Sequence, residues 1–333
     1  MPAEAAQASP PPAPPPGAGA EALLQHLEWT VLKRLDGLLQ GDWRSAFRGR
    51  GVDLADLREY QLHDDVRHID WNVTARLQVP HVRQYNEDRE LCAWFLLDRS
   101  ASMHFGSGAL RKLDQAAAFT GALARLFTQH GNRVGAVLYG RAVDAVLPPG
   151  ASRRHVLNLL QRLQQPLPLT PPGQPSTTGT ALADLLQAAD GVLKRRSLVF
   201  VVSDFISQPG WAAPLARLAR RHDVLAVRLV DPVEQRLPAM GLLTVQDAET
   251  GEQLFLDTSD PGLQARHAAL VQAQDEALLQ GLTTAGCDLL EVATDQPLLP
   301  ALLRFADLRR QRARQPSPMR FPTALRRAAP ANA

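Results

Sequence analysis

Two apolar runs, each followed by an aspartate, constrain the fold of this chain most strongly. Leu91 to Leu97 leads into Asp98, and Leu198 to Val202 is followed by Asp204. Runs without polar alternation are typical of strands that are buried on both faces of a parallel sheet. Between residues 91 and 292, further strand patterns alternate with amphipathic helical patterns. The sequence therefore predicts an α/β protein with a doubly wound, mostly parallel sheet.

The pattern changes outside this region, and the changes indicate four segments. Residues 1–20 are rich in Pro and Ala and are predicted to be a disordered tail. Residues 21–90 contain an amphipathic helix over 21–39 and a stretch dense in Arg, Asp and His, which together predict a small N-terminal subdomain. Residues 91–310 form the sheet domain. Residues 311–333 are predicted to be a mobile, basic tail rich in Arg and Pro, because eight arginines face one aspartate from residue 304 onward.

Composition narrows the function classes. The 36 basic and 34 acidic residues give a formal net charge of +2, which does not indicate nucleic acid or an anionic membrane as the main partner. The two cysteines, Cys92 and Cys287, exclude a disulfide framework and a four-cysteine zinc site. The longest apolar runs are far shorter than the roughly 20 residues of a membrane span. The N-terminus has no signal-peptide pattern, so we expect a cytoplasmic protein.

Oxygen-bearing side chains gather where the strands of the predicted sheet end. Asp98, Ser100 and Ser102 follow the first apolar strand, and Asp204 follows the later one. The segment Thr178-Gly179-Thr180 precedes a predicted helix and offers a further hydroxyl. Carboxyl ends of parallel strands share one edge of a sheet, where ligands bind. Hard oxygen ligands suit Mg²⁺ or Mn²⁺, so the sequence predicts a divalent metal site at this edge.

This arrangement resembles the metal-ion-dependent adhesion site of a von Willebrand factor A domain. The resemblance rests on Asp-x-Ser-x-Ser after the first strand, Gly-Thr before a helix and an aspartate after a later strand. It implies a von Willebrand factor A-like fold. It also implies one set of metal ligands: Asp98, Ser100, Ser102, Thr180 and Asp204.

A second resemblance covers roughly Arg48 to Arg310. The segments that carry it are Leu57-Arg58-Glu59-Tyr60, Asp64-Asp65-Val66-Arg67-His68-Ile69-Asp70-Trp71, Ala75-Arg76, Asp98 to Met103, Asp231-Pro232, Leu237-Pro238 and Asp247 to Glu252. They are similar to the signature of the domain-of-unknown-function 58 family, although His63 stands where that family usually has Gly. The resemblance implies a bacterial protein that acts with a MoxR-type AAA+ ATPase as an adaptor or co-chaperone.

Three alternatives remain beside the predicted metal site. A Mg²⁺-dependent phosphohydrolase could use Asp98 as its nucleophile, but Ser100 stands where that class has a second acid. The Arg-rich C-terminal tail could bind an acidic partner or nucleic acid. The segment from His63 to Asp70 could hold a second metal, but its interleaved arginines favour a network of ion pairs. The chain contains no Gly-x-Ser-x-Gly and no phosphate-binding Gly-x-x-x-x-Gly-Lys-Ser/Thr motif.

The function predicted from the sequence is a metal-dependent protein-binding module that is not an enzyme. Its cofactor is expected to be Mg²⁺ or Mn²⁺. Its partners are expected to be a MoxR-type AAA+ ATPase and a client protein. Neither a membrane nor a nucleic acid is expected as a partner.

Overall fold

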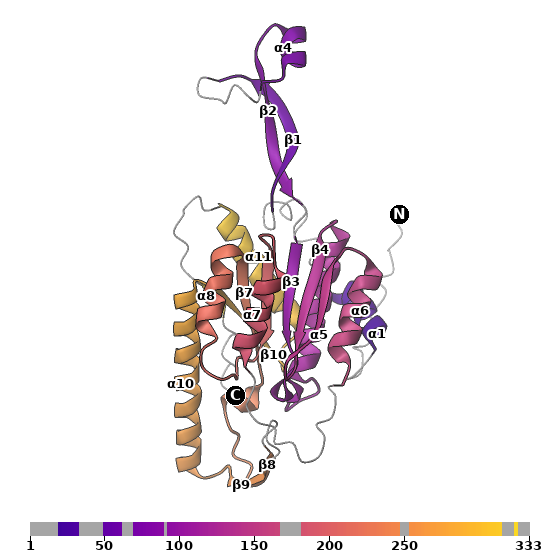
Figure 1. Ribbon diagram of the computed structural model, residues 1–333. Coiled ribbons are helices and arrows are strands. Elements are labelled where there is room, and N and C mark those ends of the chain that lie inside the picture. The colour runs from indigo at the N-terminus through magenta and orange to yellow at the C-terminus, as the bar shows by residue number, and fades with distance from the viewer. Residues whose placement is uncertain are drawn as a thin grey trace, which may run out of the picture.

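A seven-stranded sheet forms the centre of the protein, as a computed structural model shows (Figure 1). The structure describes residues 19–32, 49–61, 69–89, 92–166, 181–246, 253–314 and 323–325. The strand order is β11-β10-β7-β6-β3-β4-β5. The strands are β3 (Cys92–Asp98), β4 (Arg133–Tyr139), β5 (Val143–Gly150), β6 (Leu198–Ser203), β7 (Asp223–Val230), β10 (Asp288–Ala293) and β11 (Ala324–Leu325). All neighbouring strands are parallel except β4 and β5, which confirms the mostly parallel sheet.

The apolar runs form strands that are covered on both faces. In β3, Phe95 and Leu97 point into one buried cluster, whereas Trp94 and Leu96 point into another. This alternation follows from the two-residue period of a strand. The sheet is therefore doubly wound, as the sequence predicts.

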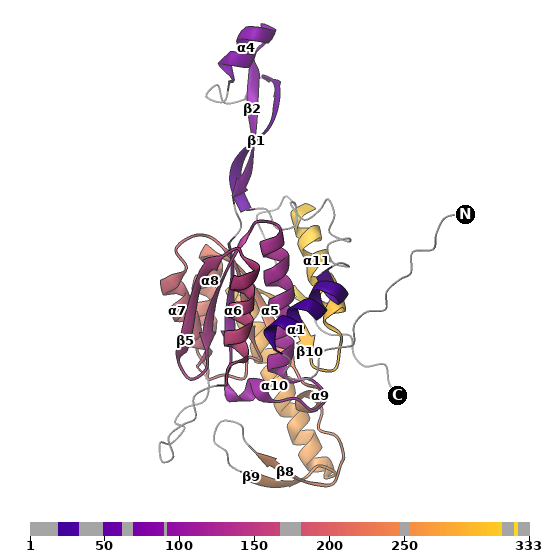
Figure 2. The same ribbon diagram turned by 90° about the vertical axis from the view of Figure 1, so that its right-hand side faces the viewer.

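Helices cover the two faces (Figures 1 and 2). The helices that contribute to the cluster of Phe95 are α1 (Ala20–Leu27), α5 (Lys112–Gln129), α6 (Arg153–Gln164) and α11 (Leu298–Arg314). The helices that contribute to the cluster of Trp94 are α7 (Leu182–Val192), α8 (Ala212–Arg221) and α10 (Pro261–Ala285). At the centre of the first cluster the rings of Phe95 and Phe200 stack, with their centroids 4.9 Å apart. None of the helices in the described part of the chain is long and apolar enough to cross a membrane.

The N-terminal helix packs against the sheet domain. The described helix α1 begins one residue before the predicted helix of 21–39 and is followed by a short π-helix (Glu28–Leu32) within that range. Leu24 and Leu27 are buried in the same cluster as the side chains of α5. The Nε of Arg125 on α5 also donates to Glu28 at 2.7 Å. This helix is therefore a further covering layer of the sheet.

An antiparallel ribbon extends from the amino end of β3, which is the end away from Asp98 (Figures 1 and 2). It consists of β1 (Gly49–Glu59) and β2 (His81–Arg89), with α4 (Trp71–Leu77) at its tip. Asp70 caps α4, because its carboxylate accepts the backbone N–H groups of Asn72 and Val73 at 3.0 and 3.2 Å. Of the segment from His63 to Asp70, only the last two residues lie in the described part of the chain.

The carboxyl edge of the sheet carries shorter elements. These are the 3₁₀-helix η3 (Ala101–His104), α9 (Pro232–Gln235) and the antiparallel hairpin of β8 (Leu242–Gln246) and β9 (Gln253–Asp257). The hairpin lies below this edge in both views (Figures 1 and 2). The candidate site lies at the same edge.

Two described elements extend into the predicted C-terminal tail of 311–333. Helix α11 continues to Arg314, and β11 pairs with β10. Leu289 donates its N–H to the carbonyl of Thr323 at 3.0 Å, and Thr323 donates to Asp288 at 2.9 Å. The physical reason is that β10 would otherwise be an open edge strand with unpaired backbone groups.

Candidate functional site at the carboxyl edge of the sheet

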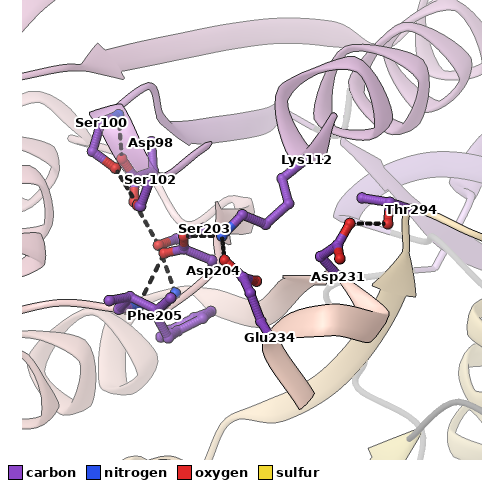
Figure 3. Close-up of polar contacts among 11 residues, drawn as sticks. Asp98, Ser100, Ser102, Lys112, Ser203, Asp204, Phe205, Asp231, Glu234 and Thr294 are labelled. Carbon is purple, nitrogen blue, oxygen red and sulfur yellow. Dashed lines mark hydrogen bonds and ion pairs between the residues drawn. The ribbon is translucent and has the colours of Figure 1, made fainter. Parts of the chain in front are cut away.

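The register of two parallel strands brings Asp98 and Ser203 together. Leu97 of β3 pairs with Val202 of β6, so the residues that follow them lie side by side at the edge of the sheet. The Ser203 hydroxyl donates to Oδ2 of Asp98 at 2.6 Å (Figure 3). Both side chains are buried. Ser203 was not singled out from the sequence, because a serine at the end of an apolar strand carries no distinctive signal.

The loop after β3 turns two hydroxyls toward the same region. The other oxygen of Asp98, Oδ1, accepts the backbone N–H of Ser100 at 2.8 Å, which fixes the turn. The hydroxyl oxygens of Ser100 and Ser102 lie 3.1 Å apart (Figure 3). The predicted grouping of these three residues is therefore present. Thr180, another of the five predicted ligands, lies outside the described residues, as does Thr178.

Asp204 occupies the same edge, but it is bound to a lysine that the sequence interpretation missed. Nζ of Lys112 donates to Oδ2 of Asp204 at 2.7 Å and to Oε1 of Glu234 at 2.6 Å (Figure 3). Oδ1 of Asp204 accepts the backbone N–H of Ile206 at 3.0 Å. Lys112 begins α5 and Glu234 belongs to α9, so three elements meet at one ammonium group.

The electrostatics of the site are dominated by the buried carboxylates of Asp98 and Asp204 and the partly buried one of Glu234. Burial, together with the negative charge of Asp204, raises the pKa of Asp98 to about 6. Burial acts to lower the pKa of Lys112, but Asp204 and Glu234 outweigh it and the pKa is raised. Burial also raises the pKa of Glu234, although Lys112 opposes this shift. When all four groups are charged, three carboxylates face one ammonium and two negative charges remain unbalanced.

This donor set fits a hard divalent cation. Asp98, Ser100 and Ser102 offer carboxylate and hydroxyl oxygens, and Asp204 adds negative charge nearby. Mg²⁺ and Mn²⁺ prefer such ligands, and a charge of +2 would balance the site. Among the described residues, no group of three or more His, Cys, Asp or Glu side chains could hold a metal ion, so the candidate depends on the serine hydroxyls.

A second polar cluster at the same edge is structural. Oδ2 of Asp231 accepts from the backbone N–H of Ser107 at 2.9 Å and from the hydroxyl of Thr294 at 2.7 Å. Oδ1 accepts the N–H of Val233 at 3.0 Å and caps α9. This aspartate positions α9, and therefore also Glu234, which that helix carries.

Comparisons with known proteins identify relatives that are similar to this chain over most of its length. The uncharacterized protein Rv1480 of Mycobacterium tuberculosis is 36% identical over 292 residues, which cover 88% of this chain and 90% of the relative. The uncharacterized protein MAV169 of Mycobacterium avium is 32% identical over 165 residues, or 50% of this chain and 95% of the relative.

Solved structures also match, at low sequence identity. The conserved hypothetical protein BatB from Bacteroides thetaiotaomicron is 15% identical with a TM-score of 0.40, covering 67% of this chain and 99% of that protein. The SpRpn10 VWA domain is 13% identical with a TM-score of 0.34, and the match covers 65% of this chain and 95% of that domain.

The family comparison agrees with the resemblance that the sequence motifs carry. The family described as "Protein of unknown function DUF58" matches residues 56–277, which include most of the ribbon, both strand-end aspartates and Lys112. The chain belongs to the DUF58 family.

Proposed function

We propose that this protein is a metal-dependent protein-binding module that acts as an adaptor or co-chaperone for a MoxR-type AAA+ ATPase. One observation supports the metal dependence above all others. The side chains of Asp98, Ser100 and Ser102 converge beside Asp204, at a site whose charged groups leave two negative charges unbalanced. The partner class rests on the family resemblance, since proteins of this kind commonly accompany such ATPases.

Each residue has a distinct part in this proposal. Asp98 is the anionic ligand, and the backbone N–H of Ser100 and the hydroxyl of Ser203 hold its carboxylate in place. Ser100 and Ser102 supply neutral oxygens, and Thr180 is a further predicted ligand. Asp204 contributes charge. When bound, Mg²⁺ or Mn²⁺ would offer a coordination position to an acidic side chain of the partner.

The edge is also accessible to a partner. Phe105 and Ile206 flank the site and are 40% and 46% exposed. Phe105 follows the loop of Ser100 and Ser102, and Ile206 follows Asp204. Aromatic side chains such as Phe105 are enriched in protein-binding surfaces.

The phosphohydrolase alternative has less support. Such an enzyme would use Asp98 as a nucleophile and would need a second acid two residues later to protonate the leaving group. Ser100 stands at that position, and its hydroxyl lies against Ser102. Both oxygens of Asp98 also accept hydrogen bonds, which reduces its nucleophilicity. The Arg-rich tail alternative depends largely on residues outside the described part of the chain.

The test is binding of the full chain to its cognate MoxR-type ATPase, measured in Mg²⁺ and in EDTA. Without metal, the partner's carboxylate would face Asp98 and Asp204 uncompensated. We expect affinity to fall at least tenfold in EDTA, which corresponds to about 1.4 kcal/mol. Asp98→Ala should reproduce this loss in Mg²⁺.

A matched variant controls for the loss of a carboxylate. Glu276→Ala removes an exposed acid from α10 and should leave the affinity unchanged. Equal affinity with and without metal, in the wild-type protein, would contradict the proposed function.

A further inference from the structure

Lys112 is an unusual residue in this chain. Of the 36 basic residues only three are lysines, so arginine is the usual cation of the sequence. Lys112 is nevertheless fully buried, at 0% exposure. It also begins α5, where the helix dipole disfavours a positive charge. Both the burial and the position are unfavourable for an ammonium group unless its surroundings compensate.

The compensation comes from two carboxylates on other elements. Nζ of Lys112 lies 2.7 Å from Asp204 and 2.6 Å from Glu234. It also lies 5.9 Å from the centroid of the Phe105 ring, and the backbone N–H of Lys112 donates to the carbonyl of Phe105 at 2.9 Å. A compact ammonium can contact both carboxylates as a point charge, whereas a guanidinium is a larger planar fork.

The same contacts determine the charge of the site. Without the ammonium, Asp204 and Glu234 would repel one another, and Asp204 would also repel Asp98, at a place where burial keeps the dielectric low. With it, Asp204 and Glu234 share one positive charge, whereas none of the ion pairs among the described residues involves Asp98. Lys112 therefore reduces the net charge of the Asp204 and Glu234 pair from two negative charges to one, and it leaves Asp98 open to a cation.

We propose that Lys112 is the internal counter-ion of the carboxyl-edge site. Its ammonium group holds Asp204 and Glu234 when no metal ion is bound, so that the site is formed in advance of binding. It also limits the unbalanced charge to two, which matches a divalent cation. This inference rests on the proposed function for the identity of that cation, but the role of Lys112 as counter-ion to Asp204 and Glu234 can be tested without it.

The experiment compares the full-length wild type with Lys112→Met, which keeps an unbranched chain but removes the charge. Melting temperatures are measured in EDTA and in saturating Mn²⁺, and Mn²⁺ binding is followed by calorimetry. We expect Lys112→Met to lose more stability in EDTA than in Mn²⁺. The rise in melting temperature caused by Mn²⁺ should be at least twice that of the wild type.

A compensating variant separates charge from packing. Combining Lys112→Met with Glu234→Gln removes one carboxylate along with the ammonium, so at least half of the melting-temperature loss in EDTA should be recovered. Lys194→Met is the matched control, because Lys194 is exposed and its removal should change neither measurement. If Lys112→Met alone does not fold, recovery of a cooperative transition in the double variant still supports the counter-ion role.

Two results would count against the role of Lys112. Lys112 would be a packing residue if Lys112→Met lowered the melting temperature equally in EDTA and in Mn²⁺ and Glu234→Gln recovered none of that loss. A double variant that does not fold would lead to the same conclusion. A wild-type protein that shows neither heat nor a melting shift with Mn²⁺ would contradict the proposed function instead. In that case, the recovery of the melting temperature in EDTA by the double variant would still decide the role of Lys112.

Discussion

Asp98 and Asp231 are buried aspartates at the same edge, with opposite titration behaviour. Burial and the charge of Asp204 raise the pKa of Asp98 from 3.8 to about 6. Burial alone would raise the pKa of Asp231, but hydrogen bonds from Ser107, Thr294 and Val233 lower it. The carboxylate of Asp231 is therefore satisfied by the fold, whereas that of Asp98 is stabilised too little by its neighbours. This contrast is expected of a structural residue and a ligand-binding residue.

Asp98→Asn should stabilise the metal-free protein at pH 8. Because its pKa is raised, folded Asp98 binds a proton more tightly than the unfolded chain does. The stability from this group is present below the unfolded value of 3.8 and is lost as pH rises through about 6. In EDTA, we expect a gain on the order of 2 kcal/mol in urea unfolding at pH 8 that largely disappears at pH 4.

Asp231→Asn is the matched control for that measurement, and its effect should have the opposite sign. Its lowered pKa means that its contribution is present above the unfolded value and is lost as pH falls through the lower folded value. The variant should therefore be less stable than the wild type at pH 8. A loss of stability at pH 8 in Asp98→Asn would show that the buried carboxylate is already compensated in the metal-free protein.

The residues that the sequence predicts for the site are those with short-range signals. Asp98, Ser100 and Ser102 lie within five positions, and Asp204 follows an unmistakable strand. Lys112 and Glu234 could not be paired from the sequence, because 122 positions separate them and only the folded sheet edge brings them together. The rarity of lysine in the chain was the one available signal.

At the scale of elements, continuous apolar runs predicted the buried strands well, because no other element of that length is apolar on both sides. The antiparallel direction of β5 and the short strand β11 were not predicted. β11 has only two residues, and its pairing depends on the open edge of β10 rather than on its own composition. The ribbon of β1 and β2 was also missed, since its sequence is dominated by charged residues.

Two phenylalanines on different strands should respond differently to truncation. Phe200 of β6 is fully buried between Phe95, Phe119 and Phe305, whereas Phe255 of β9 is 81% exposed. Phe200→Ala should cost about 3 to 5 kcal/mol, because it opens a cavity in the core. Phe255→Ala should change stability by less than about 0.5 kcal/mol in urea denaturation. A large loss in Phe255→Ala would show that the hairpin is packed against another part of the chain.

At the scale of the whole molecule, the site and the ribbon lie at opposite ends of the sheet domain (Figures 1 and 2). The site is at the carboxyl end of β3, whereas β2 is connected to the amino end of the same strand. At the ribbon tip, Trp71 of α4 is 69% exposed. Distant sites without shared partners usually contribute independently to free energies. The protein therefore has two separate surfaces, and the one at the carboxyl end of β3 carries the negative charge that a metal ion would balance.

Trp71→Ala should accordingly leave the melting temperature and the heat of Mn²⁺ binding unchanged, because its side chain is largely exposed and α4 lies at the tip of the ribbon, beyond the sheet domain (Figure 1). It should also leave affinity for the ATPase within about twofold of the wild type, whereas Asp98→Ala should lower it at least tenfold. The two variants in one binding assay therefore identify the end of the molecule that meets the partner. Loss of binding in Trp71→Ala, together with normal binding in Asp98→Ala, would place the contact on the ribbon.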